Sequence, residues 1–380
     1  IGEIPAEISR LDHVDSISLR KNCLYGTLPP ELGELPLKYL GLAENAFSGF
    51  IPETLFNLTS VEYVFLSFQN GNRWNCTRSR GGIVDIYYSH GDQAQGANLG
   101  LQGKILGDKI SNLSSLRTIS ITKNQFSGTI STDISSLKQL ENMYAESNKI
   151  RSSIPTEIAL MENIRVLDLS QNYLTGEIPQ DVGNLKRLEY FALSGNGGLS
   201  GPLPSSLFEL KSLQYIYFQE NSLTGKIPSS IGMYQDLVGL NLGSNEFTGS
   251  LPNGLYNLTN LMFLYLHENS LGGSISDKIG QLTALTQLSL YGNPFTGTIP
   301  SSLGLCEELE NLYLHETNLH GTVPEEVCAL TMKSLVPQEY NALSADCYPD
   351  IETLVPFITC GCCDICCDHV TLECVTAVME

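Results

Sequence analysis

Two histidine–glutamate pairs come closest to an acid–base arrangement in this sequence. His267 precedes Glu268, and His315 precedes Glu316. A histidine beside a carboxylate can serve as a general base when both side chains face a substrate. The sequence carries no HExxH, no GxSxG, no glycine-rich phosphate loop and no kinase signature. We therefore predict no catalytic residue, no metal site and no cofactor, and a protein that is not an enzyme.

Aromatic and acidic residues recur around these pairs and form the predicted ligand-binding surface. Tyrosine combines a flat apolar ring with a polar hydroxyl, which suits peptide side chains and sugar rings alike. The alternative interpretation is that tyrosines on neighbouring strands pack against each other and stiffen a sheet. The predicted ligand-binding residues are Tyr144, Tyr190, Tyr215, Tyr217, Glu220, Phe263, Tyr265, His267, Glu268, Tyr313, His315 and Glu316.

The net charge narrows the choice of partner. The 380 residues carry a formal charge of −20 at pH 7. Such a field repels nucleic acid and anionic membrane surfaces, and it favours cations, basic peptides or neutral sugars. No run of 18 apolar residues is present, so we expect no membrane-spanning segment in this sequence.

A repeated pattern determines the elements that must position these residues. The segment 164–179 reads IRVLDLSQNYLTGEIP, which has the skeleton LxxLxLxxNxLxGxIP. Neighbouring copies lie 23 to 25 residues apart, and Gln69 and Thr317 take the asparagine position in degenerate copies. The asparagine position itself holds Asn22, Asn45, Asn124, Asn148, Asn172, Asn196, Asn221, Asn245, Asn269 and Asn293.

Each position of the skeleton has a physical role. The LxL leucines point inward from a short strand, because side chains alternate with a period of two. An inward asparagine can hydrogen-bond otherwise unpaired backbone groups of the turn. The glycine permits a tight backbone, and the proline starts the return segment. One unit cannot bury its own apolar faces, so the copies must stack into a solenoid.

The LxGxIP signature resembles the plant-type extracellular leucine-rich-repeat family, which includes receptor-like kinase ectodomains and polygalacturonase-inhibiting proteins. The resemblance implies an α/β solenoid: a right-handed superhelix with a concave parallel sheet of about 13 strands and short helices or 3-10 turns on the convex side. We expect the array to cover residues 1–327.

The repeat pattern fails at about residues 70–98. This stretch contains the single Trp74 and Cys76, and Ile83, Ile86 and Tyr88 fit one further strand of the array. One interpretation is a loop that contributes to ligand binding, since long loops are often functional. The other is a relic of an N-terminal cap, which is tolerated because lengthening a loop costs little.

A cysteine-rich segment, 328–380, follows the array. Its cysteines resemble the C-terminal cap of leucine-rich-repeat proteins from stramenopile algae such as diatoms, and a cross-linked flap would cover the exposed end of a solenoid. A thiolate metal cluster is the rival interpretation of the CxCCxxCC spacing, but thiols oxidise in a secreted protein. The predicted disulfide cysteines are Cys328, Cys347, Cys360, Cys362, Cys363, Cys366, Cys367 and Cys374.

Four Asn-x-Ser/Thr sequons, at Asn57, Asn75, Asn112 and Asn257, predict N-linked glycans if the chain is secreted. We therefore expect a secreted or cell-surface protein that binds a protein, peptide or polysaccharide on its concave face. The alternative is a structural subunit that assembles head to tail into a filament, because the chain starts in mid-repeat and leaves Ile4 and Ile8 without cover. Inhibition of a wall-degrading enzyme is a further possibility. Ice binding is another, but it requires a flat, regular array of threonines, which the convex positions Glu177, Lys226 and Ser250 do not supply.

Overall fold

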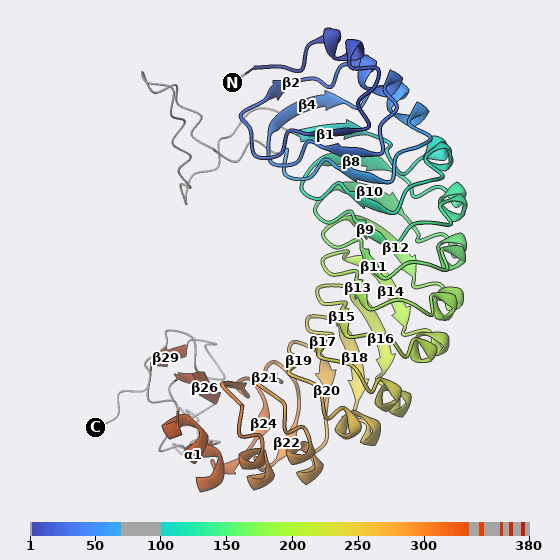
Figure 1. Cartoon of the computed structure of the whole chain (residues 1–380). Coiled ribbons are helices and arrows are strands. Elements are labelled where there is room, and N and C mark those ends of the chain that lie inside the picture. Colours follow the sequence, from blue (N-terminus) through green and yellow to red (C-terminus); the bar gives the residue numbers. More distant parts are fainter. Residues whose placement is uncertain are drawn as a thin grey trace, which may run out of the picture. The chain divides into compact units, whose positions relative to one another are not determined.

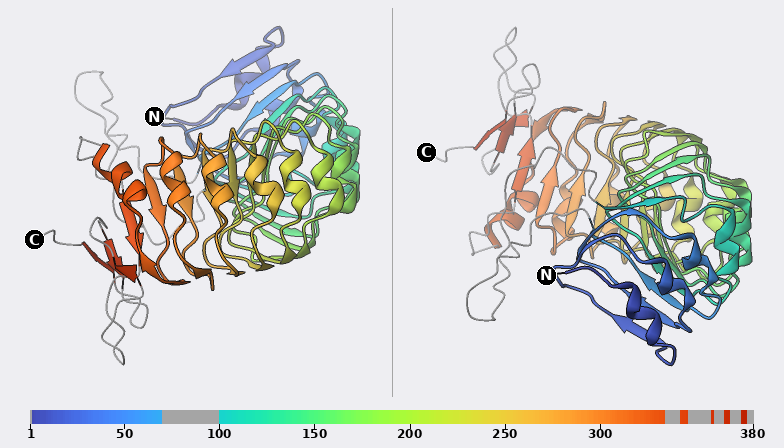
Figure 2. Two further views of the ribbon diagram at one scale, coloured as in Figure 1. Left: turned by 90° about the horizontal axis from the view of Figure 1, so that it is seen from below. Right: turned by 90° about the horizontal axis from the view of Figure 1, so that it is seen from above.

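The computed structural model describes residues 2–69 and 100–333, together with the short strands 342–345, 358–359, 365–367 and 374–376. The chain divides into two compact units, Ile1–Leu188 and Glu189–Glu380. Both units are built from one plan (Figures 1 and 2): each repeat gives one strand to a first sheet, one strand to a second sheet, and one short helix on the side away from the first sheet.

In the first unit, six parallel strands form the first sheet. They are β1 (Ser16–Ser18), β3 (Tyr39–Gly41), β5 (Tyr63–Phe65), β7 (Thr118–Ser120), β9 (Asn142–Tyr144) and β11 (Val166–Asp168). The second sheet contains β2 (Tyr25–Gly26), β4 (Ala46–Phe50), β6 (Gly100–Gly103), β8 (Gln125–Gly128), β10 (Lys149–Ser152) and β12 (Tyr173–Glu177). The 3-10 helices are η1 (Ala6–Arg10), η2 (Pro30–Glu34), η3 (Glu53–Asn57), η4 (Asp108–Asn112), η5 (Thr132–Ser136), η6 (Thr156–Leu160) and η7 (Gln180–Asn184).

The second unit continues the same plan. Its first sheet contains β13 (Tyr190–Ala192), β15 (Tyr215–Tyr217), β17 (Gly239–Asn241), β19 (Phe263–Tyr265), β21 (Gln287–Ser289) and β23 (Asn311–Tyr313). The second sheet contains β14 (Gly198–Pro202), β16 (Ser222–Lys226), β18 (Glu246–Gly249) and β20 (Ser270–Leu271), and β22 (Thr296–Gly297) pairs with β24 (Asn318–Leu319). The helices are η8 (Ser205–Glu209), η9 (Ser229–Met233), η10 (Asn253–Asn257), η11 (Asp277–Gln281), η12 (Ser301–Leu305) and the α-helix α1 (Glu325–Lys333).

The predicted asparagine positions form a hydrogen-bonded ladder. The side-chain NH2 of Asn172 donates to the carbonyl oxygens of Leu169 (3.1 Å) and Ser170 (3.0 Å) in its own repeat. It also donates to the carbonyl of Ala145 in the preceding repeat (2.9 Å), and its Oδ1 accepts from the backbone N–H of Ile150 (3.0 Å). One buried side chain therefore satisfies backbone groups of two repeats, which explains why asparagine recurs at this position in the stacked repeats.

The degenerate position Gln69 joins this ladder, as the sequence predicts. Its Nε2 donates to the carbonyl of Leu42 (2.6 Å), and its Oε1 accepts from the backbone N–H of Phe47 (3.2 Å). The repeat then resumes at β6, where Leu101 N–H donates to Asn124 Oδ1 (3.0 Å). The stretch after Gln69 is therefore inserted between the two halves of a single repeat.

The strand predicted at Ile83, Ile86 and Tyr88 lies outside the described residues. In the first sheet, β5 pairs directly with β7 in the register Tyr63↔Thr118. Because these two strands are direct neighbours, no further strand lies between them. The expectation that this stretch adds a strand to the first sheet between β5 and β7 is therefore wrong. The array strands of the first sheet among the described residues then number six in each unit.

The first sheet extends into the cysteine-rich segment. The strand β26 (Ala342–Ala345) pairs in parallel with β23, and β28 (Ile365–Cys367) pairs in parallel with β26. The last strand, β29 (Cys374–Thr376), runs antiparallel to β28, and β27 (Ile358–Thr359) pairs with β25 (Gly321–Thr322). A reversed, short edge strand makes a poor template for further pairing.

The start of the first unit differs from the sequence expectation. Ile4 was expected to lack cover, but its side chain is buried, with 7% of its surface exposed, while Ile8 is partly exposed. The N–H of Tyr25 donates to the carbonyl of Gly2, which holds this first segment against β2. The filament alternative assumes that Ile4 and Ile8 lack cover, and this assumption does not hold for Ile4.

Candidate ligand-binding face

The solvent-exposed side of the first sheet, which we call the strand face, carries the predicted ligand-binding residues. In the second unit three tyrosines from two adjacent strands form a cluster, which we call the tyrosine cluster: Tyr190 on β13, and Tyr215 and Tyr217 on β15. The ring of Tyr190 lies 6.0 Å from that of Tyr215 and 5.6 Å from that of Tyr217. All three side chains are half-buried, so each ring keeps one part accessible.

A glycine on the next strand gives the tyrosine cluster its floor. A Cβ atom at Gly239, on β17, would lie 3.0 Å from Cδ1 of Tyr215 and 3.0 Å from the hydroxyl oxygen of Tyr217. The two rings therefore lean across the backbone of β17. Burial raises the pKa of the Tyr217 hydroxyl, and the neighbouring Tyr215 raises it further, so this group is protonated at neutral pH.

The strands β19 and β21 add a second aromatic group. The rings of Phe263 and Tyr265 stack at 6.5 Å with an interplanar angle of 20°. The hydroxyl of Tyr265 donates to Oε1 of Gln287 on β21. The hydrogen bond fixes the direction of the Tyr265 ring, so this ring is already ordered before any ligand arrives.

Three rings from consecutive repeats stack face to face just beyond the ends of β19, β21 and β23. The ring of Tyr291 lies 4.8 Å from His267, at an interplanar angle of 12°, and 4.5 Å from His315, at 8°. We call this group the ring stack. Both histidines are among the predicted ligand-binding residues, whereas Tyr291 is not, although it occupies the equivalent position of the repeat between them.

Burial dominates the electrostatics of the ring stack. It lowers the pKa of His267 and of His315, although Glu268 and Glu220 partly oppose the shift at His267. The Nδ1 atom of His267 is buried and finds no hydrogen-bond partner among the described residues. Both imidazoles are therefore neutral at pH 7, and each stacks one ring face on Tyr291.

The acidic residues flank the stack at a repeated backbone position. Glu220, Glu268 and Glu316 each directly precede the ladder position and have φ values of 59°, 50° and 54°. Glu268 accepts a hydrogen bond from the hydroxyl of Ser244. The strand face of the second unit thus combines a run of rings with a row of carboxylates, an arrangement suited to a ligand with apolar and basic groups.

One predicted residue belongs to the other unit. Tyr144 lies on β9 of the first unit, where burial and the carboxylate of Asp168 raise the pKa of its hydroxyl. The remaining predicted ligand-binding residues all fall between Tyr190 and Glu316. Tyr144 is therefore part of a separate compact unit, and the ligand-binding role of all these residues stays a prediction.

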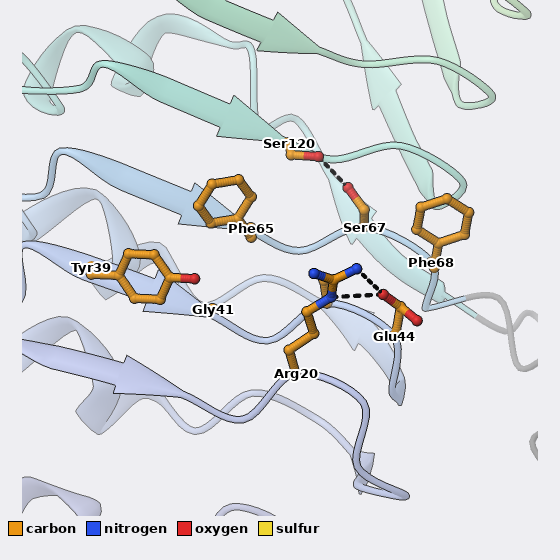
Figure 3. Close-up of a pocket in the computed structure, with 9 residues that line it drawn as sticks. Arg20, Tyr39, Gly41, Glu44, Phe65, Ser67, Phe68 and Ser120 are labelled. Atoms are coloured by element: carbon orange, nitrogen blue, oxygen red, sulfur yellow. Dashed lines mark hydrogen bonds and ion pairs between the residues drawn. The ribbon is translucent and has the colours of Figure 1, made fainter. Parts of the chain in front are cut away.

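The first unit carries a pocket of about 300 Å³ on its strand face, which sequence reasoning missed (Figure 3). Two small residues, Gly41 and Ala43, leave the space on β3 and directly after it. The rings of Tyr39, Phe65 and Phe68 surround it. The signal for this pocket in the sequence is that Gly41 and Ala43 occupy the strand-face positions that hold Phe65 and Ser67 in the following repeat.

Three of the predicted glycosylation sites are exposed. Asn57, Asn112 and Asn257 are the last residues of η3, η4 and η10, on the side away from the first sheet. Asn75 lies outside the described residues. The glycans themselves stay a prediction.

The cysteines fall into two groups. Cys328 is disulfide-bonded, and so is Cys23, whose pairing the sequence did not predict. Cys306 is free and buried, and burial raises the pKa of its thiol to about 11. Nothing is described of the side chains of the other predicted disulfide cysteines, including those in the CxCCxxCC segment.

Among the described residues, no helix is long and apolar enough to cross a membrane. Within the same part of the chain, no cluster of three or more His, Cys, Asp or Glu side chains has the arrangement of a metal site.

Comparison with known families agrees with the geometry. The family model described as Leucine Rich Repeat matches residues 163–185, 212–233, 236–258 and 284–306. The chain is a leucine-rich-repeat solenoid. No curated protein sequence matches it.

Solved structures place this solenoid beside plant receptors. The ectodomain of the Arabidopsis thaliana receptor kinase GASSHO1/SCHENGEN3, in complex with CASPARIAN STRIP INTEGRITY FACTOR 2, is 29% identical with a TM-score of 0.69, over 87% of this chain and 39% of that one. The plant peptide hormone receptor RGFR1, in complex with RGF2, is 29% identical with a TM-score of 0.68, over 87% and 52%. A leucine-rich-repeat protein of Leptospira interrogans is 26% identical with a TM-score of 0.67, over 91% and 76%. The chain spans about half or less of the two plant receptors.

Proposed function

We propose that this solenoid is an extracellular recognition module that binds a peptide or protein on the strand face of its second unit. The observation that carries the proposal is the set of half-buried rings on the strand face: the tyrosine cluster on β13 and β15, Tyr265 on β19, and the ring stack beyond β19, β21 and β23. Partly exposed aromatic groups on a rigid sheet contribute contact area at a low cost in ordering entropy. Parallel strands in regular register hold them at fixed spacing.

Charge supports a ligand with basic groups. The chain carries −20 overall. The carboxylates of Glu220 and Glu268 act electrostatically on His267, and those of Glu268 and Glu316 act on Tyr291. A basic ligand would be attracted at a distance and then held by contacts with the rings. Since GASSHO1/SCHENGEN3 and RGFR1 were solved with CASPARIAN STRIP INTEGRITY FACTOR 2 and RGF2, respectively, a peptide is the ligand class we favour.

An extracellular location and a non-enzymatic role follow from the same resemblance and belong to this proposal. A polysaccharide ligand, which would use the same tyrosines, and head-to-tail assembly stay predictions without a supporting observation. Oligosaccharide arrays are therefore a necessary arm of the test.

The test begins with selection of binders from a displayed random peptide library and from an oligosaccharide array. Tyr217→Ala is then compared with Tyr173→Ala, which removes an exposed tyrosine from the second sheet. We expect Tyr217→Ala to weaken binding of the selected peptides at least about 30-fold, the effect of losing an anchor of about 2 kcal/mol, and Tyr173→Ala to leave it unchanged. Both variants must keep the parent melting temperature. Equal binding by both variants would place the site elsewhere, and selection of oligosaccharides alone would overturn the ligand class.

A further inference from the structure

The pocket on the strand face of the first unit has a physical cause in the sequence. Gly41 has no side chain, and the Tyr39 ring lies over it, since a Cβ atom at Gly41 would be 2.7 Å from Cε1 of Tyr39. The ring of Phe65 stands 5.6 Å from that of Tyr39, tilted by 42°. Because Ala43 continues the floor beyond Gly41, the two rings bound a hollow rather than a filled surface.

Four polar side chains at the rim are paired with each other. Arg20 Nε donates to Oε1 of Glu44 at 2.7 Å, and the hydroxyls of Ser67 and Ser120 share a hydrogen bond of 2.5 Å (Figure 3). A sugar needs several donors and acceptors that are free to bind it, whereas an apolar group needs only to displace water. The pocket therefore favours an apolar occupant.

Phe68 provides a second, independent indication. This bulky residue has φ of 61°, in the left-handed region that such side chains rarely adopt, and it remains 42% exposed. The equivalent position in other repeats holds Lys, Glu, Ser, Gln or Gly. Because the left-handed φ recurs at this position in other repeats, the unusual feature is the residue type. Phe68 places an aromatic ring at the edge of the pocket, with Nζ of Lys123 5.0 Å from its centre, and the exposed part of the ring can contact an occupant.

We propose that this pocket binds one aromatic side chain of a protein ligand, with the incoming ring packed among Tyr39, Phe65 and Phe68. Its volume of about 300 Å³ is at the lower end for ligand sites, so it has room for one ring rather than for an extended molecule. The inference rests on the proposed function in one respect, namely that the aromatic side chain belongs to a protein ligand. Whether the pocket binds an aromatic ring at all is tested separately.

The experiment uses the full chain with methyl-labelled alanine and three small probes: N-acetyl-phenylalaninamide, N-acetyl-alaninamide and methyl β-glucoside. The methyl group of Ala43 forms part of the floor, so a ring that enters the pocket shifts its NMR signal. Ala145, which is fully buried in the same unit, is the internal control. We expect the aromatic amide alone to shift Ala43, with saturation at millimolar concentration, and to leave Ala145 unchanged.

Two variants complete the design. Ala43→Leu fills the floor and should abolish saturation transfer from the protein to the aromatic amide. Ser136→Leu adds the same side chain at the exposed last residue of η5, on the side away from the first sheet, and should leave this transfer unchanged. The proposal is overturned if the glucoside shifts Ala43, if Ala43 and Ala145 shift alike, or if no probe shifts Ala43. A positive result together with failure of the Tyr217→Ala test would reject the site on the second unit and leave this one standing.

Discussion

At the scale of single residues, the ladder asparagines connect one repeat to the next. Replacing Asn172 by Ala removes the donor to Ala145 and the acceptor for Ile150, both buried. Leaving such groups unpaired should lower the free energy of unfolding by about 1–3 kcal/mol. The matched control is Asn184→Ala at the exposed end of η7, with an effect within about 0.5 kcal/mol. Chemical denaturation measures both, and equal effects would contradict the role of the ladder.

The ring stack makes stability depend on pH in a defined direction. Burial lowers the pKa of His267 and His315 below the ordinary value of about 6.5, so between the folded and unfolded pKa values the unfolded chain binds more protons. Stability is therefore complete above about pH 6.5 and falls as the pH falls towards the folded pKa values. The variant His267→Phe, His315→Phe keeps the stack without the titration, so its melting temperature should fall less between pH 7.5 and 5.5.

The control for this effect is His13→Phe, because the side chain of His13 is 98% exposed. This variant should follow the parent protein across the same range of pH. Parallel curves for all three proteins would show that carboxylates alone produce the acid sensitivity and that the ring stack contributes nothing to it.

At the scale of the repeat element, one serine occupies a position made for glycine. In the LxGxIP skeleton the third position has positive φ, for example 79° at Gly176 and 85° at Gly225, yet Ser152 takes it with φ of 120°. Because a side chain is strained there, Ser152→Gly should raise the free energy of unfolding by about 0.5–2 kcal/mol. The adjacent substitution Ser153→Gly relieves no such strain, so it should lower the free energy of unfolding by about 0.5–1 kcal/mol. Changes of the same sign would contradict the strain argument.

The insertion after Gln69 gives a second prediction for the element. Deleting residues 70–99 joins Gln69 to Gly100 and Leu101, which restores the ladder-x-Leu spacing of the other repeats. Because β5 already pairs with β7 and β4 with β6, the shortened repeat should fold with a melting temperature within a few degrees of its reference. Cys23 is disulfide-bonded, and the deletion removes another cysteine, Cys76. Both the deletion and the reference therefore carry Cys23→Ser, so that a change in disulfide bonding at Cys23 does not contribute to the difference. Aggregation of the deletion variant alone would show that the insertion is structural.

These elements also show where sequence reasoning stops. Apolar spacing predicted the strands and the ladder because burial and backbone hydrogen bonding fix those residue types. The left-handed position before the ladder was invisible, since it holds Lys21, Glu44 or Gln171 as readily as glycine, and each looks like an ordinary surface residue. The pocket was not predicted, because it forms where Gly41 and Ala43 have no large side chain to fill the space. The ring stack was found only in part, because stacking depends on three repeats together.

At the scale of the whole molecule, the odd number of cysteines has a structural explanation. Cys306 follows η12 at the position where Leu258 and Leu282 follow η10 and η11, so it fills the core as a leucine would. It is free and fully buried, whereas Cys23 and Cys328 are disulfide-bonded. If the other cysteines are also oxidised, the 11 cysteines leave one thiol.

Thiol labelling of the denatured, unreduced protein should therefore modify a single cysteine, which peptide mapping assigns to Cys306. The native protein should label slowly, because the thiol is buried and its raised pKa, about 11, leaves little thiolate at pH 8. Cys306→Leu should remove the labelling and keep the melting temperature, since leucine is the residue of the repeat pattern at this position. Eight labelled cysteines, or zinc released on denaturation, would instead indicate a reduced, metal-binding C-terminal segment and would overturn the inference of an oxidising compartment.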